Sequence, residues 1–362
     1  MRRLNYITTD EWWDTDVNIL KDLVEHYDLY VYVLSPAPKR CKYSIKEIKG
    51  CSHLCNINYR FRKRNLLSFI FMFEYYVRAV FAAHKKGCIN FCMYGWHPFL
   101  IPFFLYLFPR KNTILSAHNY QVHSHSRYDV TKFFYKRYRH FHFHSKLQMD
   151  LFLKDYPKGK AFYTQMLPKD FGSPNGLFSL DKQKKKVLLA FGLIRKYKRL
   201  DLLIEAVNKL NSDDVLVLIA GYSGDFSGYE AMIKDKSKFR CEIRFIDNAE
   251  IADMFTISDF LVLPYDDATQ SGPSLIALNY GLPIIASDLP AFKELIEEGA
   301  NGYLFRKGSV ESLSMVIDRA LKLSSDELFI LKNNQYSAKS KYIRDNNPFI
   351  KFDRFINNIV LK

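Results

Sequence analysis

The sequence has few cysteines and lacks the patterns that give cysteine or histidine a metal-binding role. Its six cysteines include no C-x-x-C pair, and no histidine pair completes a metal site beside its C-x-x-x-C spacings. The strand expected at 140–145, HFHFHS, alternates three histidines on one face without an acidic or cysteine partner nearby, which favours structural packing. The first residues, MRRLNYITTDEWWDTD, also lack the apolar region of a secretory signal. We therefore expect reduced thiols and no bound metal.

No uncharged apolar run is long enough to cross a membrane. The most apolar stretch, 65–83, is interrupted by Glu74 and Arg78 and falls short of the roughly 18 uncharged residues of a spanning helix. Basic clusters flank it at 60–64 and 85–86. Two interpretations stay open: a buried helix with solvated charged ends, or an interfacial helix that contacts anionic lipid. Different faces of one helix can do both.

Acidic residues are scarce in the first half of the chain. Residues 1–180 hold 27 of the 53 Lys and Arg residues but only 13 of the 38 Asp and Glu residues. This half therefore carries a net charge of +14 out of the chain's +15. Such an asymmetry indicates an anionic partner, which can be a nucleic acid, an anionic membrane surface or a phosphorylated acceptor.

The length and the order of the apolar segments predict two α/β domains. At 362 residues the chain is too long for one typical domain. Residues 1–170 open with a strand, a helix and a strand, and a Gly-, Pro- and Ser-rich linker follows at 171–185. Residues 186–340 alternate short apolar strands with helices, and 341–362 form a C-terminal helix expected to pack on the N-terminal domain. The fold class expected is α/β, with two Rossmann-like doubly wound parallel sheets facing across a cleft.

Two cations follow the first strand of the C-terminal half. In FGLIRKYKRLDLLIEA (191–206), Arg195 and Lys198 come after a strand and the turn at Gly192, just before a helix. Ligands of doubly wound sheets bind at such strand ends. Cations held there can clamp a diphosphate and stabilise its charge as it leaves. A solvated basic loop would show the same sequence, since Lys196 and Arg199 are adjacent.

Two further turns at strand ends are built from small residues. IAGYSGD (219–225) places Gly221 where a ligand can approach the backbone. TQSGPS (269–274) runs directly into a helix, with a proline in the first turn, where proline is preorganised. The free N–H groups of such a helix start bind anions. The candidate residues of this second turn are Gln270, Ser271, Gly272, Pro273 and Ser274.

Together these segments resemble the donor-binding half of the GT-B glycosyltransferases, specifically glycosyltransferase family 4. GLIRKYKRLDLLIEA is similar to the family's G-x-x-R-x-Y-K-G-x-x-x-L-L-x-A segment, and LPY…GLPIIASDLPAFKELIEEGANGYLF to its LP…GxPVVAS…xExxxxGxxGxLF signature. The resemblance covers 186–306 strongly and the N-terminal half loosely. It implies transfer of a sugar from a nucleoside-diphosphate sugar, a UDP- or GDP-sugar, without an essential metal or other cofactor.

The resemblance also implies roles for single residues. Arg195 and Lys198 fall on the positions that hold the donor pyrophosphate. The backbone of Ser271 and Gly272 falls on the turn that meets phosphate and sugar. His118 matches the family's histidine beside the transferred sugar, where it can hydrogen-bond the sugar or stabilise charge; a structural histidine capping a loop is the alternative.

The sequence departs from the family at two glutamates. Their E-x7-E positions align with Ala268 and Ile276, and neither residue is acidic. The second glutamate normally receives the ribose hydroxyls, so ribose recognition is expected to differ here, through backbone or through Asp247 or Glu250. Glu294 matches a family position near the donor-sugar loop, although a solvated helix carboxylate is an equal interpretation.

The first loop of the N-terminal half, DEWWDTDV, combines aromatic rings with carboxylates. Trp12 and Trp13 suit stacking on an acceptor sugar, and Asp14 or Asp16 could deprotonate an acceptor hydroxyl. In the alternative interpretation one of these aspartates caps the first helix and Trp12 packs in the core. His123 is a further acceptor-side candidate.

The function predicted is glycosyl transfer to a saccharide or lipid acceptor held by the basic N-terminal domain. A membrane-linked acceptor, as in surface polysaccharide or lipopolysaccharide synthesis, would explain both the charge and the apolar surface. We expect a cytoplasmic protein, located at the inner face of the cell membrane if it contacts lipid. The main alternative is a non-catalytic nucleotide-binding scaffold of the same fold. A nucleic-acid-binding protein would explain the charge but not the phosphate-site residues, so no nucleic acid is expected.

Overall fold

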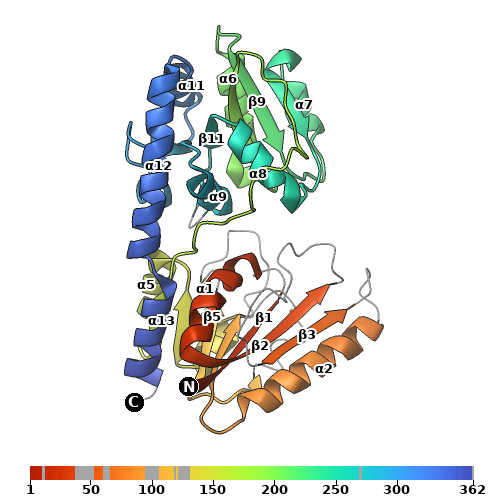
Figure 1. The fold of residues 1–362 in the computed structure, drawn as a ribbon, viewed down its shortest axis with the longest axis vertical. Helices are drawn as coiled ribbons and strands as arrows, with labels where there is room; N and C mark the ends of the chain where they lie inside the picture. Colours follow the sequence, from red (N-terminus) through yellow and green to blue (C-terminus); the bar gives the residue numbers. More distant parts are fainter. Residues whose placement is uncertain are drawn as a thin grey trace. The chain divides into compact units, whose positions relative to one another are not determined.

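The computed structural model describes residues 1–9, 13–36, 53–59, 66–93, 106–117, 120, 131–268 and 271–360. They form two compact units, one of Met1–Leu167 with Asn346–Lys362 and one of Pro168–Asp345. Each unit has a single sheet of parallel strands with helices on both faces (Figure 1). The predicted pair of doubly wound α/β units is confirmed.

The N-terminal unit contains seven parallel strands in the order β3-β2-β1-β4-β5-β6-β7. These strands are β1 (Arg2–Thr9), β2 (Tyr27–Pro36), β3 (His53–Tyr59), β4 (Ile89–Met93), β5 (Thr113–Ala117), β6 (His140–Phe143) and β7 (Lys160–Tyr163). Strands β5 and β6 are buried along their whole length, as central strands covered on both faces should be.

Helices cover both faces of this sheet. Those of the unit are α1 (Trp13–His26), α2 (Leu66–Ala83), α4 (Thr131–Arg137), α5 (Lys146–Asp155) and α13 (Pro348–Phe355). Helices α2, α4 and α5 pack on one face in a shared core that includes the fully buried ring of Phe152. Helices α1 and α13 pack on the other through Leu20, Leu23, Phe352 and Phe355. The last helix therefore completes the core of the first unit.

The C-terminal unit contains six parallel strands in the order β10-β9-β8-β11-β12-β13. They are β8 (Lys186–Phe191), β9 (Val215–Ala220), β10 (Phe239–Glu242), β11 (Phe260–Leu263), β12 (Ile284–Ser287) and β13 (Gly302–Phe305). Numbered along the chain, the order is 3-2-1-4-5-6, which reverses direction between β8 and β11. This reversal decides where a ligand can enter.

Before the long helix α12, the described part of this unit contains eight helices and short helical turns between and after the strands. They are η3 (Lys196–Lys198), α6 (Leu200–Asn208), α7 (Ser227–Met232), η4 (Lys236–Lys238), α8 (Asn248–Ile257), α9 (Gly272–Tyr280), α10 (Pro290–Lys293) and α11 (Val310–Leu321). Helices α6 and α11 cover one face of the sheet, and α8, α9 and α10 the other.

A long helix, α12 (Ser325–Asp345), packs along α9. The Gln335 amide donates to the carbonyl of Leu282, and the Tyr336 hydroxyl donates to that of Tyr280. The helix continues without a break past residue 340, to the point where the chain returns to the N-terminal unit.

The irregular segment before β8 is fixed on α8 by one carboxylate. Asp253 accepts hydrogen bonds from the backbone N–H groups of Asn175, Gly176 and Phe178 at 2.8, 3.1 and 3.0 Å. Because Asp253 is buried, these three bonds satisfy it and hold the segment in place. Residues 171–185 are therefore an ordered part of the C-terminal unit.

Candidate functional site

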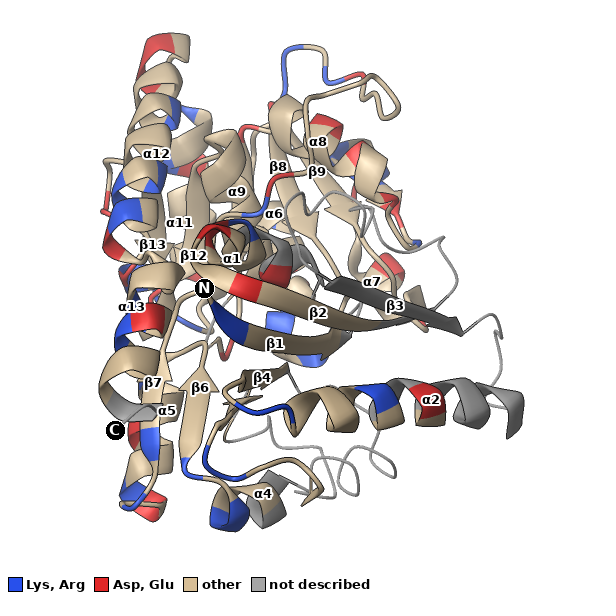
Figure 2. Ribbon diagram, turned by 60° about the horizontal axis from the view of Figure 1, so that its bottom comes forward, with Lys and Arg blue, Asp and Glu red and all other residues tan. Residues whose placement is uncertain are grey.

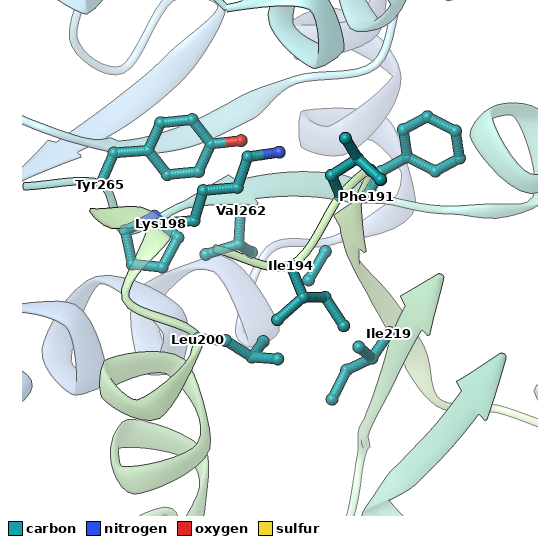
Figure 3. A pocket seen from close by; sticks show the side chains of 11 residues that line it. Phe191, Ile194, Lys198, Leu200, Ile219, Val262 and Tyr265 are labelled. Atoms are coloured by element: carbon teal, nitrogen blue, oxygen red, sulfur yellow. The ribbon is translucent and has the colours of Figure 1, made fainter. Parts of the chain in front are cut away.

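A cavity opens at the carboxyl ends of β8 and β11, where the strand order reverses. Figure 3 shows its lining side chains, among them Lys198 after β8 and Tyr265 after β11. Gly192, Leu193 and Ile194, which follow β8, also line the cavity. In open α/β sheets, ligands bind in the crevice outside the strand ends at this reversal. The segment 191–206 supplies much of the lining and 219–225 supplies Ile219, while Pro273 of the third segment lies close to Gly192.

Two glycines let the loops after β8 and β9 touch. Gly192 has a φ of +99°, and its N–H donates to the carbonyl of Ala220 at 2.9 Å. A Cβ atom on Gly221 would lie 2.0 Å from the carbonyl oxygen of Gly192. Only glycine permits this approach, which keeps one wall of the cavity free of side chains.

Lys198 lies inside the cavity wall, close to Gly192. A Cβ atom added to Gly192 would lie 3.2 Å from Lys198 Nζ, and Nζ lies 5.4 Å from the centre of the Tyr265 ring. Burial, and then the charge of Arg195, lower the pKa of Lys198 to about 8. No carboxylate of the described residues forms an ion pair with it. A partly buried ammonium without a counter-ion is suited to receive an anionic ligand.

Arg199, unlike Lys198, forms ion pairs within the described part of the protein. It adopts a left-handed φ of 50°, and its guanidinium contacts Asp201 at 2.9 Å and Asp266 at 3.2 Å. The N–H of Asp266 also donates to the carbonyl of Tyr197 at 2.8 Å. Arg199 thus ties the loop after β8 to the loop after β11. Its charge is used within the protein, whereas Arg195 is exposed beside Lys198.

Helix α9 begins at the same edge of the sheet. Ser271 caps it: its hydroxyl accepts from the N–H of Ser274 at 3.4 Å, and the Ser274 hydroxyl donates to the Ser271 carbonyl at 2.7 Å. Pro273 lies in the first turn, 3.8 Å from where a Cβ atom on Gly192 would be. No atom lies within 4 Å of a Cβ atom built on Gly272. The helix start therefore combines free space with N–H groups suited to an anion. Gln270 lies outside the described residues.

The structure does not bring the remaining donor-side candidates into this cavity. Glu294 is exposed at the end of α10, where its charge acts on Tyr342 of α12. Ile276 is buried in the core between the sheet and α8, α9 and α10, and Ala268 packs against the same core. Asp247 and Glu250 form the capping box of α8, and Glu250 also pairs with Arg244 at 2.6 Å.

In the N-terminal unit, Asp16 is held inside the protein. It lies within α1, which begins at Trp13, so Asp16 does not cap this helix. Its carboxylate accepts hydrogen bonds from the hydroxyls of Tyr6, at 2.8 Å, and Thr8. Asp14 lies in the first turn of α1. The backbone of Trp13 is described, whereas Trp12, His118 and His123 lie outside the described residues.

The histidines of β6 pack within the sheet and against aromatic rings. His142 contacts the hydroxyls of Ser116 and Thr164, each at 2.7 Å, and thereby links β6 to β5 and to the residue that follows β7. His144 contacts the ring of His142, and His140 meets Phe355 of α13 edge to face. Burial lowers the pKa of His140 to about 4. Among the described residues, no three His, Cys, Asp or Glu side chains form a group that could hold a metal ion.

The sequence analysis did not identify Tyr265 or the ion pair between Arg199 and Asp266. Tyr265 follows Pro264 directly after β11, and only this position at a strand end could have signalled it. It is 4% exposed, and its hydroxyl has no hydrogen-bond partner in the described structure. Burial raises its pKa well above the usual value. The pairing of Asp266 could not be predicted from the sequence, because its partner Arg199 is 67 residues away in the chain.

Comparison with solved structures identifies the architecture. A sucrose-phosphate synthase from Thermosynechococcus elongatus matches with a TM-score of 0.71, 13% identity and 100% coverage of both chains. A glycosyltransferase from Rickettsia africae ESF-5 matches at 0.68, with 14% identity over 100% of this chain and 99% of that one. Anabaena HepE in complex with UDP matches at 0.66, with 13% identity over 97% and 99%. The chain has the two-unit GT-B fold.

Sequence comparison then identifies the C-terminal unit. Residues 177–339 match the family model described as glycosyl transferases group 1, and this unit therefore carries a group 1 glycosyltransferase domain. Glycogen synthase from Pseudomonas syringae pv. syringae (strain B728a) is 27% identical over 150 residues. That stretch is 41% of this chain, and the chain spans only 31% of that relative. The predicted resemblance is confirmed where its motifs lie.

Proposed function

We propose that the protein transfers a sugar from a nucleoside-diphosphate sugar to an acceptor. The observation that carries this proposal is Lys198, an ammonium partly buried at the strand-order reversal without a carboxylate partner among the described residues. The start of α9 and the side-chain-free backbone of Gly192 lie beside it. A diphosphate would receive charge from Lys198 and Arg195 and hydrogen bonds from the helix start.

In the proposed reaction, the bond between the anomeric carbon and the diphosphate breaks and a bond to an acceptor oxygen forms. The acceptor hydroxyl gives up its proton, and the diphosphate leaves with additional negative charge. Lys198 and Arg195 would stabilise that charge where it develops, and in many enzymes such electrostatic stabilisation contributes more to catalysis than any other effect. We propose that these cations make an essential metal unnecessary.

The donor that we propose is a UDP-sugar or a GDP-sugar. HepE was solved with UDP and with UDP-glucose, and Arabidopsis starch synthase IV with ADP and acarbose, so related folds accept different bases. The acceptor proposed is a saccharide or a lipid-linked saccharide of surface polysaccharide or lipopolysaccharide synthesis. His118, Asp14 and Asp16 remain the candidates for contacts to the reacting groups, with Trp12, Trp13 and His123 toward the acceptor.

A non-catalytic nucleotide-binding scaffold is the second candidate. The buried position of Ile276 favours it, since no carboxylate stands where the family has its second glutamate. Thermal unfolding with UDP, GDP, ADP and CMP, and with UDP- and GDP-sugars, tests both functions, because a ligand that binds only the folded state raises the melting temperature. The enzyme function is supported if nucleotides of one base raise the melting temperature and the protein also releases free sugar from the nucleotide sugar of that base. Stabilisation without any turnover supports the scaffold, and no stabilisation contradicts both.

We also propose that the N-terminal unit contacts an anionic membrane surface. Among the described residues, no helix is both long and apolar enough to span a bilayer. Helix α2 buries Ala79, Ala82 and Ala83 but leaves Phe73 56% and Phe81 74% exposed. Large aromatic rings exposed on a basic unit suit the interface of a bilayer.

Basic residues gather at the carboxyl end of the same helix. His84 contacts the carbonyl of Leu107 at 2.8 Å, so the segment around Tyr106 and Leu107 lies beside this end of α2. Figure 2 shows basic positions in the loop from α2 to β4 and around the end of α4. We define the interfacial patch as a set of exposed aromatic, apolar and basic residues. Its members are Phe81, Lys85, Lys86, Tyr106, Leu107, Arg110 and Lys111.

Replacing Phe81 by Ser is expected to weaken sedimentation with liposomes that contain anionic lipid, by about tenfold or more. The ring contributes roughly 1.5–3 kcal/mol when it is buried in an apolar phase. Phe329→Ser is the matched control, because Phe329 is 65% exposed on α12 of the other unit. Binding should also fall with added salt, as contacts between exposed charges do. Equal binding by both variants would contradict the membrane proposal and favour a soluble acceptor.

A further inference from the structure

Tyr265 has a buried hydroxyl without a hydrogen-bond partner among the described residues. Its side chain is 4% exposed. Leaving a buried hydroxyl unsatisfied is unfavourable, and native structures contain few such groups. Burial raises the pKa of Tyr265 and the Ser271 side chain opposes that rise, but Ser271 does not meet the geometry of a hydrogen bond to Oη. Such a group at a ligand cavity calls for a functional explanation.

The Tyr265 ring is fixed in its position. Phe292 packs against it with ring centres 5.8 Å apart and planes at 62°, and Tyr197 meets it edge to face at 5.8 Å. The ring belongs to the lining of the same cavity as Gly192 and Lys198. Figure 3 shows the hydroxyl of Tyr265 and the ammonium of Lys198 at the same side of this cavity. The hydroxyl therefore cannot reach solvent by a change of the side-chain rotamer without breaking these contacts.

We infer that Tyr265 Oη donates a hydrogen bond to a phosphate oxygen of the bound diphosphate, next to Lys198. This inference rests on the proposed function. Burial keeps the phenol protonated at neutral pH, so toward a phosphate oxygen it acts as a donor only. The ligand would satisfy three groups together: the hydroxyl of Tyr265, the ammonium of Lys198 and the N–H groups at the start of α9. Tyr265 would bind the ligand without giving up its proton.

Tyr265→Phe separates this role from a structural one. The variant keeps the ring and its packing, and it removes only the hydroxyl that lacks a partner. We expect the ligand-free variant to melt at the same temperature as the natural protein or above it. The affinity for nucleoside diphosphate should nevertheless fall roughly tenfold or more, which is typical of a lost hydrogen bond to a charged group.

Tyr280→Phe is the matched control in the same unit. The Tyr280 hydroxyl accepts from the N–H of Phe171 and donates to the carbonyl of Gly172, both at 2.8 Å. Removing it should lower the melting temperature and leave the affinity for nucleotide unchanged. The two tyrosines are thus expected to show opposite effects on stability and on binding.

Calorimetric titration of the full-length chain with inorganic pyrophosphate, the nucleoside diphosphate and the free nucleoside gives the decisive test. If Tyr265 contacts phosphate, Tyr265→Phe lowers the affinities for pyrophosphate and for nucleoside diphosphate by the same factor. Unchanged pyrophosphate affinity in this variant would overturn the inference, including the case in which only nucleotide binding weakens and the hydroxyl meets the ribose. If the natural protein binds nucleotide but the variant binds it equally well, the inference alone fails. If the natural protein binds none of the three, the proposed function fails with it.

Discussion

Lys198→Ala is expected to lower kcat/KM for the nucleotide sugar by a factor of about 100 to 1,000. Lys198 is the partly buried cation of the cavity, and removing one preorganised donor of a charge-stabilising site has effects of this size. The kcat should fall as well as the affinity, because the charge on the leaving diphosphate grows during the reaction. Steady-state kinetics with the donor identified by the nucleotide panel provides the measurement.

The same lysine should make diphosphate binding depend on pH. Its pKa is about 8 in the free protein, and a bound anion raises it. Affinity is therefore highest below pH 8, where the ammonium is already present, and decreases as the pH rises above 8. A titration of nucleoside diphosphate at several pH values between 6 and 10 should show this decrease. In Lys198→Ala the decrease should be absent.

Lys196→Ala is the matched control for Lys198→Ala. Lys196 lies two residues earlier in η3, is exposed, and does not line the cavity. Its removal should leave kcat/KM within about twofold, since isolated surface charges contribute little. Equal losses in both variants would mean that the loop acts through its net charge. An unchanged kcat/KM in Lys198→Ala would contradict the assigned diphosphate site.

The C-terminal unit was predictable because its sequence repeats one simple pattern. Strands such as β9 (Val215–Ala220) are short, uniformly apolar runs, and each is followed by a helix. The position of Lys198 after a strand and a glycine turn predicted its place at the carboxyl edge. The predicted roles of Arg195 and Lys198 in binding remain predictions, while the group 1 domain that contains them is confirmed.

Other features depend on contacts that a linear pattern does not contain. Strand β3 (His53–Tyr59) was missed, because HLCNINY mixes polar and apolar residues at the edge of the sheet. Strand β7 (Lys160–Tyr163) has only four residues and also lies at an edge. Edge strands need less apolar surface, so their signal is weak.

Two positions show that a side chain's role depends on its neighbours. Asp16 looked like a catalytic base or a helix cap; it lies inside α1 and does not cap it, and two hydroxyls from β1 contact its carboxylate. Arg199 was expected only as part of a solvated basic loop, yet it is paired with Asp201 and Asp266. In both cases the fold defines the partners of the side chain, and the residue type alone does not reveal them.

Gly221→Ala is expected to destabilise the C-terminal unit by about 2–4 kcal/mol, the range of a severe steric change in a packed site. The new Cβ atom would lie 2.0 Å from the carbonyl oxygen of Gly192, and this contact is to backbone, which cannot rotate away. For a unit of this size, the melting temperature should fall by roughly 5–15 °C. Thermal unfolding followed by circular dichroism provides the measurement.

The loss should extend to ligand binding, because the two loops can separate only if Gly192 moves. Gly192 lies next to Lys198 and Pro273, so its displacement disturbs the cavity wall and the approach to the start of α9. Nucleoside diphosphate affinity should therefore fall at a temperature at which the variant is still folded. Gly224→Ala is the matched control, since a Cβ atom there meets no atom within 4 Å, and it should retain both stability and binding. A Gly221→Ala variant that melts and binds like the natural protein would contradict the close contact between these loops, and with it the geometry assigned to the diphosphate site.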